Sequence, residues 1–389
     1  MNGSLGVLGF SAGRGIRIVR GSGQYVWDSQ DRRYLDFHCG NGAAFLGHSN
    51  PLIINRIKEQ MEELMVCMPI FDTPVLERCL RALSRVLPNH LREVYFLNSG
   101  SESVELAMKL ARKQKDRKRF VYFTGAFHGR TMGALSVTYN QRYKQGFEPF
   151  PWEQVSLPFN DFDQLRKIDD GVAGVIVEPV QGEGGLNVAD SGFLRELENR
   201  CREVGAYLIV DEVQSGFGRT GRVWAHLVAG IEPDIMVAGK SIGGGFPVSL
   251  VAVSEEVAGR VEEGEHGSTY GGNPLALAAV EAAVDVLIKE SVPEKSDVMG
   301  KRLWKRLLEV SSELQSVVRG VKGRGLMVGL DLRFSPTDVL KLTQLNGLLT
   351  LKAGGTVLRL LPPYLINEED VEFSGDVITR SVSAARRSS

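Results

Sequence analysis

The sequence predicts a layered α/β fold, in which a mostly parallel sheet has helices on both faces. Three segments support this: VIVEPVQGEGG at 175–185, YLIVDEVQSGFGRTG at 207–221 and DIMVAGKSIGGGFP at 234–247. Each begins as a short apolar run, the pattern of a buried parallel strand, and then breaks into Gly and polar residues where such a strand would end. Helical segments lie between several of these strands, and this alternation is typical of the architecture.

The N-terminal part of the chain changes from strands to helices. Residues 16–37 alternate and contain Gly-Ser-Gly and Asp breaks, which predicts short strands joined by turns. Residues 52–65 and 73–87 are amphipathic and predict two helices. Thr73 opens the second helix, with Pro74 at its first helical position.

The middle of the chain continues the alternation. VYFLNSGSESVELAMKLARK at 94–113 predicts a strand, a tight turn and a helix. Further strands are predicted in FVYF, AYLIV, DIMVA and SLVAVS. A Gly-Gly-Asn-Pro break at 271–274 precedes a long helix of small residues, which we expect to lead into a second domain.

Residues after about 291 predict a smaller domain. They contain a helix at 299–315, a strand-like run at 321–332 and the segment TVLRLLPPYLI. We expect a small α+β domain built from both termini, residues 1–49 and 286–389, beside a large domain at 50–285. A chain of 389 residues is too long for one compact core, which agrees with two domains.

Composition excludes several classes of function. Lys plus Arg (46) nearly equals Asp plus Glu (47), so no global charge favours nucleic acid or an anionic membrane. No apolar stretch reaches the roughly 20 residues of a membrane span, and the start, MNGSLGVLGFSAGRG, has no signal-peptide pattern. The four cysteines form no CxxC and the six histidines no HExxH, so we expect no metal site, no disulfides and a cytoplasmic protein.

The polar residues that follow the three strands include Glu183, Asp211, Gln214 and Lys240. Ligands of doubly wound sheets bind at the carboxyl ends of the strands, so these side chains should converge on one crevice. A carboxylate and a lone lysine there, with glycines that leave room for a flat ligand, indicate chemistry rather than packing.

A candidate phosphate site lies at FLNSGSES, residues 96–103, where a strand turns into a helix. Backbone amides at the start of that helix, with the hydroxyls of Ser99 and Ser101, would attract an anion. Either serine could equally be a plain helix N-cap, with Glu102 favouring the first turn.

Two nucleotide-binding alternatives have little support. No GxGxxG follows a strand, which argues against a nicotinamide-dependent dehydrogenase. The P-loop-like Gly239-Lys240-Ser241 lacks the glycine that this motif needs five residues earlier, where Asp234 stands. A phosphate cradle, a carboxylate and a lysine are instead what pyridoxal 5′-phosphate requires, together with an aromatic ring to stack on it, here Phe127.

Seven motifs occur in an order that resembles the class III, or ω-type, pyridoxal-phosphate aminotransferases. They are NSGSES, FHGRT, EPVQGEGG, VDEVQSGFGRTG, AGKSIGGGFP, STYGGNP and LRLLPP. The resemblance covers about residues 25–365 and is strongest to acetylornithine aminotransferases, including archaeal forms of arginine and lysine biosynthesis. It implies fold type I and a homodimer whose active sites lie at the subunit interface.

The resemblance implies a cofactor role for each matching residue. Lys240 would be the Schiff-base lysine, and Asp211 would pair with the pyridine nitrogen. Gln214 would reach the phenolic oxygen of the ring, on which Phe127 would stack. The phosphate would be bound by Gly100 and Ser101 of the same subunit, together with Thr269 of the partner subunit.

The resemblance also implies substrate roles. Arg130 matches the arginine that binds a substrate carboxylate, and Arg359 matches the one that takes the α-carboxylate of glutamate. Glu183 matches a glutamate that covers this second arginine while the ω-amino substrate is bound, and Ser268 would lie beside the substrate. Either arginine could otherwise be a surface ion-pair partner. His128 is expected to be a packing or hydrogen-bonding neighbour.

One departure from the family bears on the substrate. Ornithine-type members have a tyrosine about seven residues before the histidine of a Gly-His pair, and here Asn41 stands at that place, counted back from Gly47-His48. This favours N-acetylornithine or a carrier-linked, N-acylated lysine as amino donor to 2-oxoglutarate. A small acidic amino-group carrier protein would then be a partner. The alternatives are an ornithine or 4-aminobutyrate aminotransferase, a glutamate semialdehyde mutase and a nicotinamide-dependent dehydrogenase.

Overall fold

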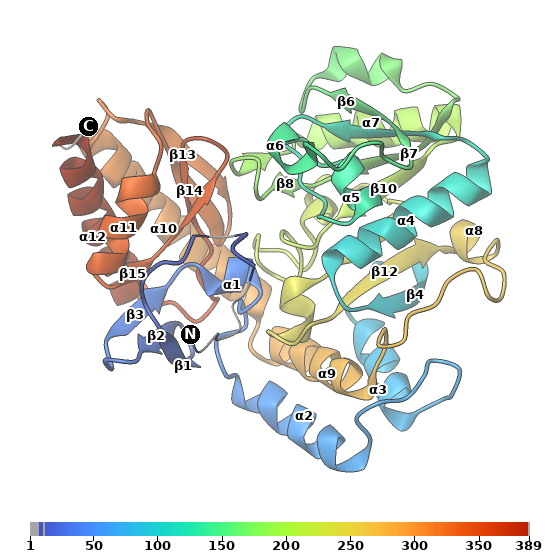
Figure 1. The fold of residues 1–389 in the computed structure, drawn as a ribbon, viewed down its shortest axis with the longest axis horizontal. Helices are drawn as coiled ribbons and strands as arrows, with labels where there is room; N and C mark the ends of the chain where they lie inside the picture. The colour runs from blue at the N-terminus through green and yellow to red at the C-terminus, as the bar shows by residue number, and fades with distance from the viewer. Residues whose placement is uncertain (1–7, 11, 388–389) are drawn as a thin grey trace, which may run out of the picture.

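The computed structural model describes residues 8–10 and 12–387. The start of the chain, for which no signal peptide is expected, lies largely outside these residues. Figure 1 shows two bodies: the middle of the chain forms one, and the N- and C-terminal parts lie together in the other. No helix in the described part of the chain is long and apolar enough to cross a membrane.

A seven-stranded sheet forms the centre of the larger body, in the order β4, β12, β11, β10, β7, β5, β6. The strands are β4 (Leu91–Leu97), β5 (Arg119–Phe123), β6 (Glu153–Leu157), β7 (Val172–Val177), β10 (Tyr207–Asp211), β11 (Ile235–Ala238) and β12 (Ser249–Ser254). Only β12 runs antiparallel to its neighbours, β11 and β4. Every residue of β7, β10 and β11 is buried, as expected for apolar strands that are covered on both faces.

Helices cover both faces of this sheet, as predicted. α4 (Gly100–Lys115) shares a buried cluster with Ile176 of β7, whereas α7 (Ser191–Val204) shares a different cluster with the adjacent Val175. Successive side chains of a strand point to opposite faces, so the two helices lie on opposite sides. The other helical elements are α2 (Pro51–Glu63), α3 (Pro74–Leu83), α5 (Met132–Ser136), α6 (Gln141–Lys144), α8 (Glu255–Ala258), α9 (Pro274–Lys289) and the 3-10 helices η1 (Phe162–Lys167), η2 (Ala225–Val228) and η3 (Lys240–Gly243).

The predicted start of α3 is confirmed in its capping geometry. The Thr73 hydroxyl accepts a hydrogen bond from the backbone N of Leu76 at 3.3 Å, and Pro74 occupies the first helical position. Asn273 caps α9 in the same way, through the backbone N of Ala276 at 3.0 Å. Each cap satisfies an amide that the first helical turn leaves without a partner.

The smaller body contains two four-stranded sheets and four helices. One sheet has the order β1 (Ile18–Ser22), β2 (Tyr25–Asp28), β3 (Arg33–Asp36), β15 (Leu348–Leu349). The other has the order β13 (Val318–Arg324), β14 (Met327–Leu332), β17 (Val357–Leu360), β16 (Leu351–Ala353). The helices are α1 (Cys39–Gly42), α10 (Val292–Glu313), α11 (Thr337–Leu345) and α12 (Glu368–Arg387), and a short hairpin, β8 (Val180–Gln181) with β9 (Asn187–Val188), faces this body.

The two ends of the chain are joined by strand pairing. β3 pairs in parallel with β15, with Leu35 opposite Leu348. The predicted packing of the N-terminal strands with the C-terminal part is therefore confirmed. We propose domain boundaries after residues 49 and 285; α9 continues to Lys289 and connects the two bodies.

Candidate active site

Two of the predicted residues, Asp211 and Lys240, lie at the carboxyl ends of neighbouring strands, and Glu178 lies at the end of a third. β7 is followed by Glu178, β10 ends with Asp211, and β11 ends two residues before Lys240. Lys240 has a left-handed φ of 49°, an uncommon conformation for a residue with a side chain. The backbone therefore leaves β11 in a sharp turn at the lysine, and such strained positions cluster at functional sites.

Asp211 is held by its neighbours from both sides. Its Oδ2 lies 2.7 Å from Nδ1 of His128, and its Oδ1 accepts a hydrogen bond from the backbone N of Val213 at 3.0 Å. The side chains of Asp211 and His128 are buried, and Nε2 of His128 has no hydrogen-bond partner among the described residues. The expectation that His128 is a hydrogen-bonding neighbour is confirmed.

A second buried carboxylate, Glu178, lies beside this pair. Its Oε1 accepts a hydrogen bond from the backbone N of Phe127 at 2.9 Å, and its Oε2 accepts one from Gly182 at 3.1 Å. Burial raises the pKa of Glu178 to about 7; His128 lowers this pKa and Asp211 raises it. Sequence reasoning gave Glu178 no role.

Arg359, on β17, is the cation of the site. Its Nη1 donates hydrogen bonds to the carbonyl of Gly182 at 2.9 Å, to Oε1 of Glu183 at 2.7 Å and to Oε1 of Gln214 at 3.0 Å. The Arg359 side chain is 2% exposed and that of Glu183 is 29% exposed. The more exposed glutamate is therefore paired with a buried guanidinium, and the substrate roles of the two residues stay predictions.

Lys240 lies in the electrostatic field of these groups. Burial lowers the pKa of Lys240 to about 8; Glu183 opposes this shift and Arg359 adds to it. Asp211 and Glu178 also raise this pKa. A lysine that is partly neutral near physiological pH is a competent nucleophile, unlike a solvated one with a pKa of about 10.4.

The start of α4 packs tightly against the FHGRT loop. Ser99 is the N-cap, since its hydroxyl accepts a hydrogen bond from the backbone N of Glu102 at 3.4 Å, so the capping alternative holds for Ser99. Ser101 Oγ accepts a hydrogen bond from the backbone N of Arg130 at 3.2 Å. A Cβ at Gly129 would lie 2.3 Å from this hydroxyl. Only glycine at position 129 therefore lets this loop lie so close to the start of α4.

Gly100 leaves equally little room at the same helix start, because a Cβ there would lie 2.8 Å from the Val213 side chain. Glycine at position 100 therefore permits the close packing of this helix start against Val213, while the Ser99 hydroxyl caps the backbone N of Glu102. The phosphate roles of Gly100 and Ser101 stay predictions.

A cavity of 530 Å³ is lined by two of the candidate residues, Phe127 and Glu183. Its lining residues are Gly125, Ala126, Phe127, Tyr139, Asn140, Gln141, Arg142, Tyr143, Glu183, Gly184, Lys352, Gly354 and Gly355. The guanidinium of Arg130 lies 3.4 Å from the ring centroid of Tyr143 and 5.6 Å from that of Phe127. Within the described residues, no ion pair joins Arg130, Arg142 or Lys352 to a carboxylate. These cations are therefore available to an anionic ligand.

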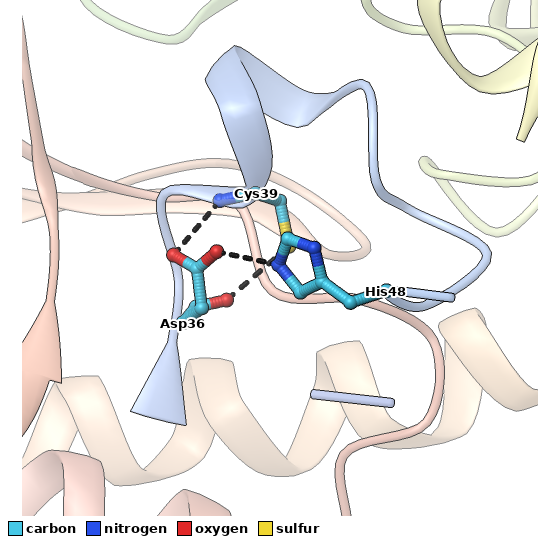
Figure 2. Close-up of side chains that lie close together, drawn as sticks. All are labelled: Asp36, Cys39 and His48. Carbon is cyan, nitrogen blue, oxygen red and sulfur yellow. Dashed lines mark hydrogen bonds and ion pairs between the residues drawn. The ribbon is translucent and has the colours of Figure 1, made fainter. Parts of the chain in front are cut away.

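Asn41 lies in α1, where the backbone of Gly40 and Asn41 departs from helical geometry, and the cluster in Figure 2 closes the surrounding residues 36–48, here called the Asn41 loop. Asp36 Oδ2 lies 2.7 Å from His48 Nε2, and Asp36 Oδ1 accepts a hydrogen bond from the backbone N of Cys39 at 3.0 Å. The Cys39 thiol donates to the Asp36 carbonyl at 3.2 Å. The side-chain ligand atoms of these three residues lie within 4.8 Å of one another, but each residue is already hydrogen-bonded. The cluster therefore shapes the loop, on which Asn41 is exposed with a left-handed φ of 56°.

Arg219 attaches this loop to the C-terminal sheet. Its guanidinium is fully buried and donates to the carbonyls of Gly42 at 2.9 Å and of Leu326 and Pro362, both at 3.2 Å. It also lies 4.3 Å from the Phe45 ring centroid. Burial lowers the pKa of Arg219 to about 10.

Ser268 and Thr269 lie on a separate loop before α9. The amide of Asn98 lies 3.5 Å from the hydroxyl of Ser268, and Thr269 is exposed. The structure does not place either residue in the cavity of its own chain. The predicted contribution of Thr269 to a partner subunit's phosphate site therefore stays a prediction.

Residues 11–382 match the protein family described as Aminotransferase class-III. The chain belongs to the class-III aminotransferases. Its sequence is 49% identical over 365 residues to the LysW-aminoadipate semialdehyde/glutamate semialdehyde transaminase of Sulfolobus acidocaldarius, with 94% of each chain covered. It is 44% identical to the acetylornithine aminotransferase of Methanopyrus kandleri, with 92% of each chain covered.

Solved structures agree with this assignment. The fold superposes on an ornithine aminotransferase from Toxoplasma gondii with a TM-score of 0.93 and 30% identity, covering 98% of this chain and 92% of the other. The corresponding values for an acetylornithine aminotransferase from Elizabethkingia anophelis are 0.86 and 30%, with 97% and 96% covered. The predicted fold type I is confirmed.

A class-III aminotransferase is a transaminase that depends on pyridoxal 5′-phosphate, and the residues here fit this cofactor. The site combines a lysine of lowered pKa, a buried carboxylate oriented by His128, and a helix start at which Gly100 and Gly129 permit close packing. When bound, the cofactor supplies an aldehyde for the amine and a ring that withdraws electrons from the substrate Cα–H bond.

Two functional candidates were missed from the sequence. Glu178 follows the apolar strand β7 just as Asp211 completes β10, so the pattern that identified Asp211 would also have identified Glu178. Arg219 gave no such signal, because its three carbonyl partners are 107, 143 and 177 residues away along the chain.

Proposed function

We propose that this aminotransferase moves the terminal amine of an N-acylated ornithine or lysine derivative to 2-oxoglutarate, which gives a semialdehyde and glutamate. The observation that carries the proposal is the pairing of Glu183 with Arg359. An arginine that was permanently free would bind the α-carboxylate of glutamate but would favour the wrong amine of an ornithine-like donor. Pairing in one half-reaction and release in the next gives the differential interaction that two unlike substrates require.

The cofactor would be held by the residues that the family resemblance implies. Lys240 would bond to its aldehyde, Asp211 would keep the pyridine nitrogen protonated, and Gln214 would contact the phenolic oxygen. Phe127 would stack on the ring. The phosphate would lie at Gly100 and Ser101 of one subunit and Thr269 of the partner subunit, in a cytoplasmic homodimer.

Proton transfer falls to Lys240 in this proposal. Once its amine is free of the cofactor, it accepts the proton from the reacting carbon of the donor and returns one to the acceptor. Its lowered pKa supports this role, because a general base works best when its pKa is near the operating pH. Arg130, with Ser268 nearby in the assembled dimer, would orient the distal carboxylate of either substrate.

The acyl group of the donor is the finer part of the proposal. The relatives from Sulfolobus acidocaldarius and Sulfurisphaera tokodaii are named for LysW-linked semialdehydes, and that from Methanopyrus kandleri for acetylornithine. The cations around the cavity, Arg130, Arg142 and Lys352, have no carboxylate partner among the described residues. They support a donor that carries further negative charge beyond its acylated amine, as a lysine linked to an acidic carrier protein would.

Steady-state kinetics with four amino donors test this proposal: N-acetylornithine, carrier-linked lysine, free ornithine and 4-aminobutyrate. The acylated donors should have the highest kcat/KM, since Asn41 replaces the tyrosine typical of ornithine-type members. A preference for free ornithine or 4-aminobutyrate would contradict the proposal.

Charge reversal at the cavity mouth tests the carrier separately. Arg142→Glu with Lys352→Glu should lower kcat/KM for the carrier-linked donor much more than for N-acetylornithine. Lys301→Glu, an exposed charge reversal on α10, is the matched control. Equal losses on both donors would remove the support for a carrier.

A further inference from the structure

The two oxygens of Glu178 each bind one loop of the active site. Oε1 accepts a hydrogen bond from the backbone of Phe127, which lies in the loop after β5, and Oε2 accepts one from Gly182, the residue before Glu183. The side chain is buried, so water does not compete for either bond. Glu178 thus fixes the loop of Phe127 and the loop of Gly182 and Glu183 to the end of β7.

Gly182 links Glu178 to Arg359 through the two peptide groups on either side of its Cα. Its N–H donates to Glu178 and its C=O accepts from Arg359 Nη1 at 2.9 Å, while the next residue supplies the carboxylate that covers this arginine. We propose that Glu178 is a positioning residue that holds Glu183 over Arg359 and thereby sets the enzyme's choice between the amino donor and glutamate. This inference rests on the switch proposed above for the Glu183–Arg359 pair.

The contact with two N–H groups favours the ionised carboxylate of Glu178, whose pKa burial raises to about 7. Two backbone N–H groups point at Glu178, and a carboxylate offers an acceptor to both. An amide or a protonated carboxyl group offers one acceptor and turns a donor towards the other N–H. The charged and titratable groups that face Glu178 are His128 and Asp211, and Lys240 lies in the same field. Glu178→Gln therefore changes the hydrogen bonds with almost no change in volume.

The test is the binding of glutarate to the holoenzyme by calorimetry. Glutarate has both carboxylates of glutamate but no amine, so its affinity reports whether Arg359 is open without any turnover. Glu183→Ala should bind glutarate more tightly than the wild type. Glu178→Gln should also bind it more tightly, by about tenfold, the factor expected for the loss of one hydrogen bond to a charged group.

The sign of this change separates positioning from general damage, because a distorted site would bind glutarate more weakly. The double variant Glu178→Gln/Glu183→Ala should bind no more tightly than Glu183→Ala alone, since Glu178 acts through Glu183. The matched control is Glu212→Gln, a buried glutamate at the end of the neighbouring strand that is bonded to His226 and Ser215. It should leave glutarate affinity within about twofold of the wild type.

The outcomes distinguish the two proposals. If Glu183→Ala tightens glutarate binding but Glu178→Gln leaves it unchanged or weaker, the inference about Glu178 is wrong and the switch stands. Further tightening in the double variant would also overturn it. If Glu183→Ala itself does not change glutarate affinity, the proposed Glu183–Arg359 switch is wrong. Should Glu178→Gln fail to fold, Glu178→Asp gives the same test, because the shorter side chain reaches only one of the two N–H groups.

Discussion

Replacing Glu183 by Gln should shift the aminotransferase towards glutamate and away from its amino donor. The change keeps the shape of the side chain and removes the charge that lies 2.7 Å from Arg359 Nη1. Arg359 keeps its hydrogen bonds to Gly182 and Gln214, so the arginine stays in place. What is lost is the charge that glutamate's α-carboxylate must displace.

The size of this effect follows from the burial of the pair. Two unit charges about 4 Å apart near a protein surface attract by about 4 kcal/mol. Glu183 is 29% exposed, and solvent screens a large part of that attraction. We take about 2 kcal/mol as the net value, which corresponds to roughly a 30-fold change in selectivity between the two half-reactions.

Single-turnover absorbance measurements of each half-reaction would provide the selectivity ratio. The rate constant for glutamate should rise or hold while that for the N-acylated amine falls. Asp331→Asn is the control, because it removes a more exposed ion pair of 3.1 Å with Arg319 on the same small sheet and should leave the ratio unchanged. Equal changes in both half-reactions of Glu183→Gln would refute the reasoning.

Three further predictions concern the cofactor residues. Lys240→Ala should abolish turnover while the cofactor still binds through its phosphate; a covalent link that borohydride still fixes would contradict the assignment. Asp211→Asn should lower the half-reaction rate about 10²–10³-fold with little change in substrate affinity, because the lost charge acts in the transition state; stopped-flow rates within a few-fold of the wild type would argue against it. Burial lowers the pKa of Lys240 to about 8. The rate of covalent reconstitution of the cofactor-free enzyme should therefore rise with pH and level off above about pH 8. A rate that does not change with pH would show that the amine is not the titrating nucleophile.

The sequence predicts the sheet well because its strands are continuous apolar runs that end in polar residues. That pattern marks strand identity and strand end together, so Asp211 and Lys240 could be placed at one edge before any coordinates. The pairing of Glu183 with Arg359, by contrast, does not follow from the strand pattern. They are 176 residues apart, with Glu183 in the turn between β8 and β9 and Arg359 on β17, and only the family resemblance paired them.

Contacts made through the backbone were beyond sequence reasoning. Glu178 acts on two amide N–H groups and Arg219 on three carbonyls, and such partners carry no side-chain signature. The closure of the Asn41 loop by Asp36 and His48 was missed for a related reason. Its residues are 12 apart, and neither the spacing nor the composition of the segment indicates a hydrogen bond.

The three carbonyls around Arg219 have a consequence for the working conditions of the enzyme. Salt screens the attraction between exposed ions, and acid removes the charge of a carboxylate. A peptide carbonyl is neutral, so neither condition changes its charge. The junction between the Asn41 loop and the C-terminal sheet should therefore keep its geometry at high ionic strength, which screens the Glu183–Arg359 pair. As ionic strength rises, the scaffold would stay constant while the balance between the two substrates shifts.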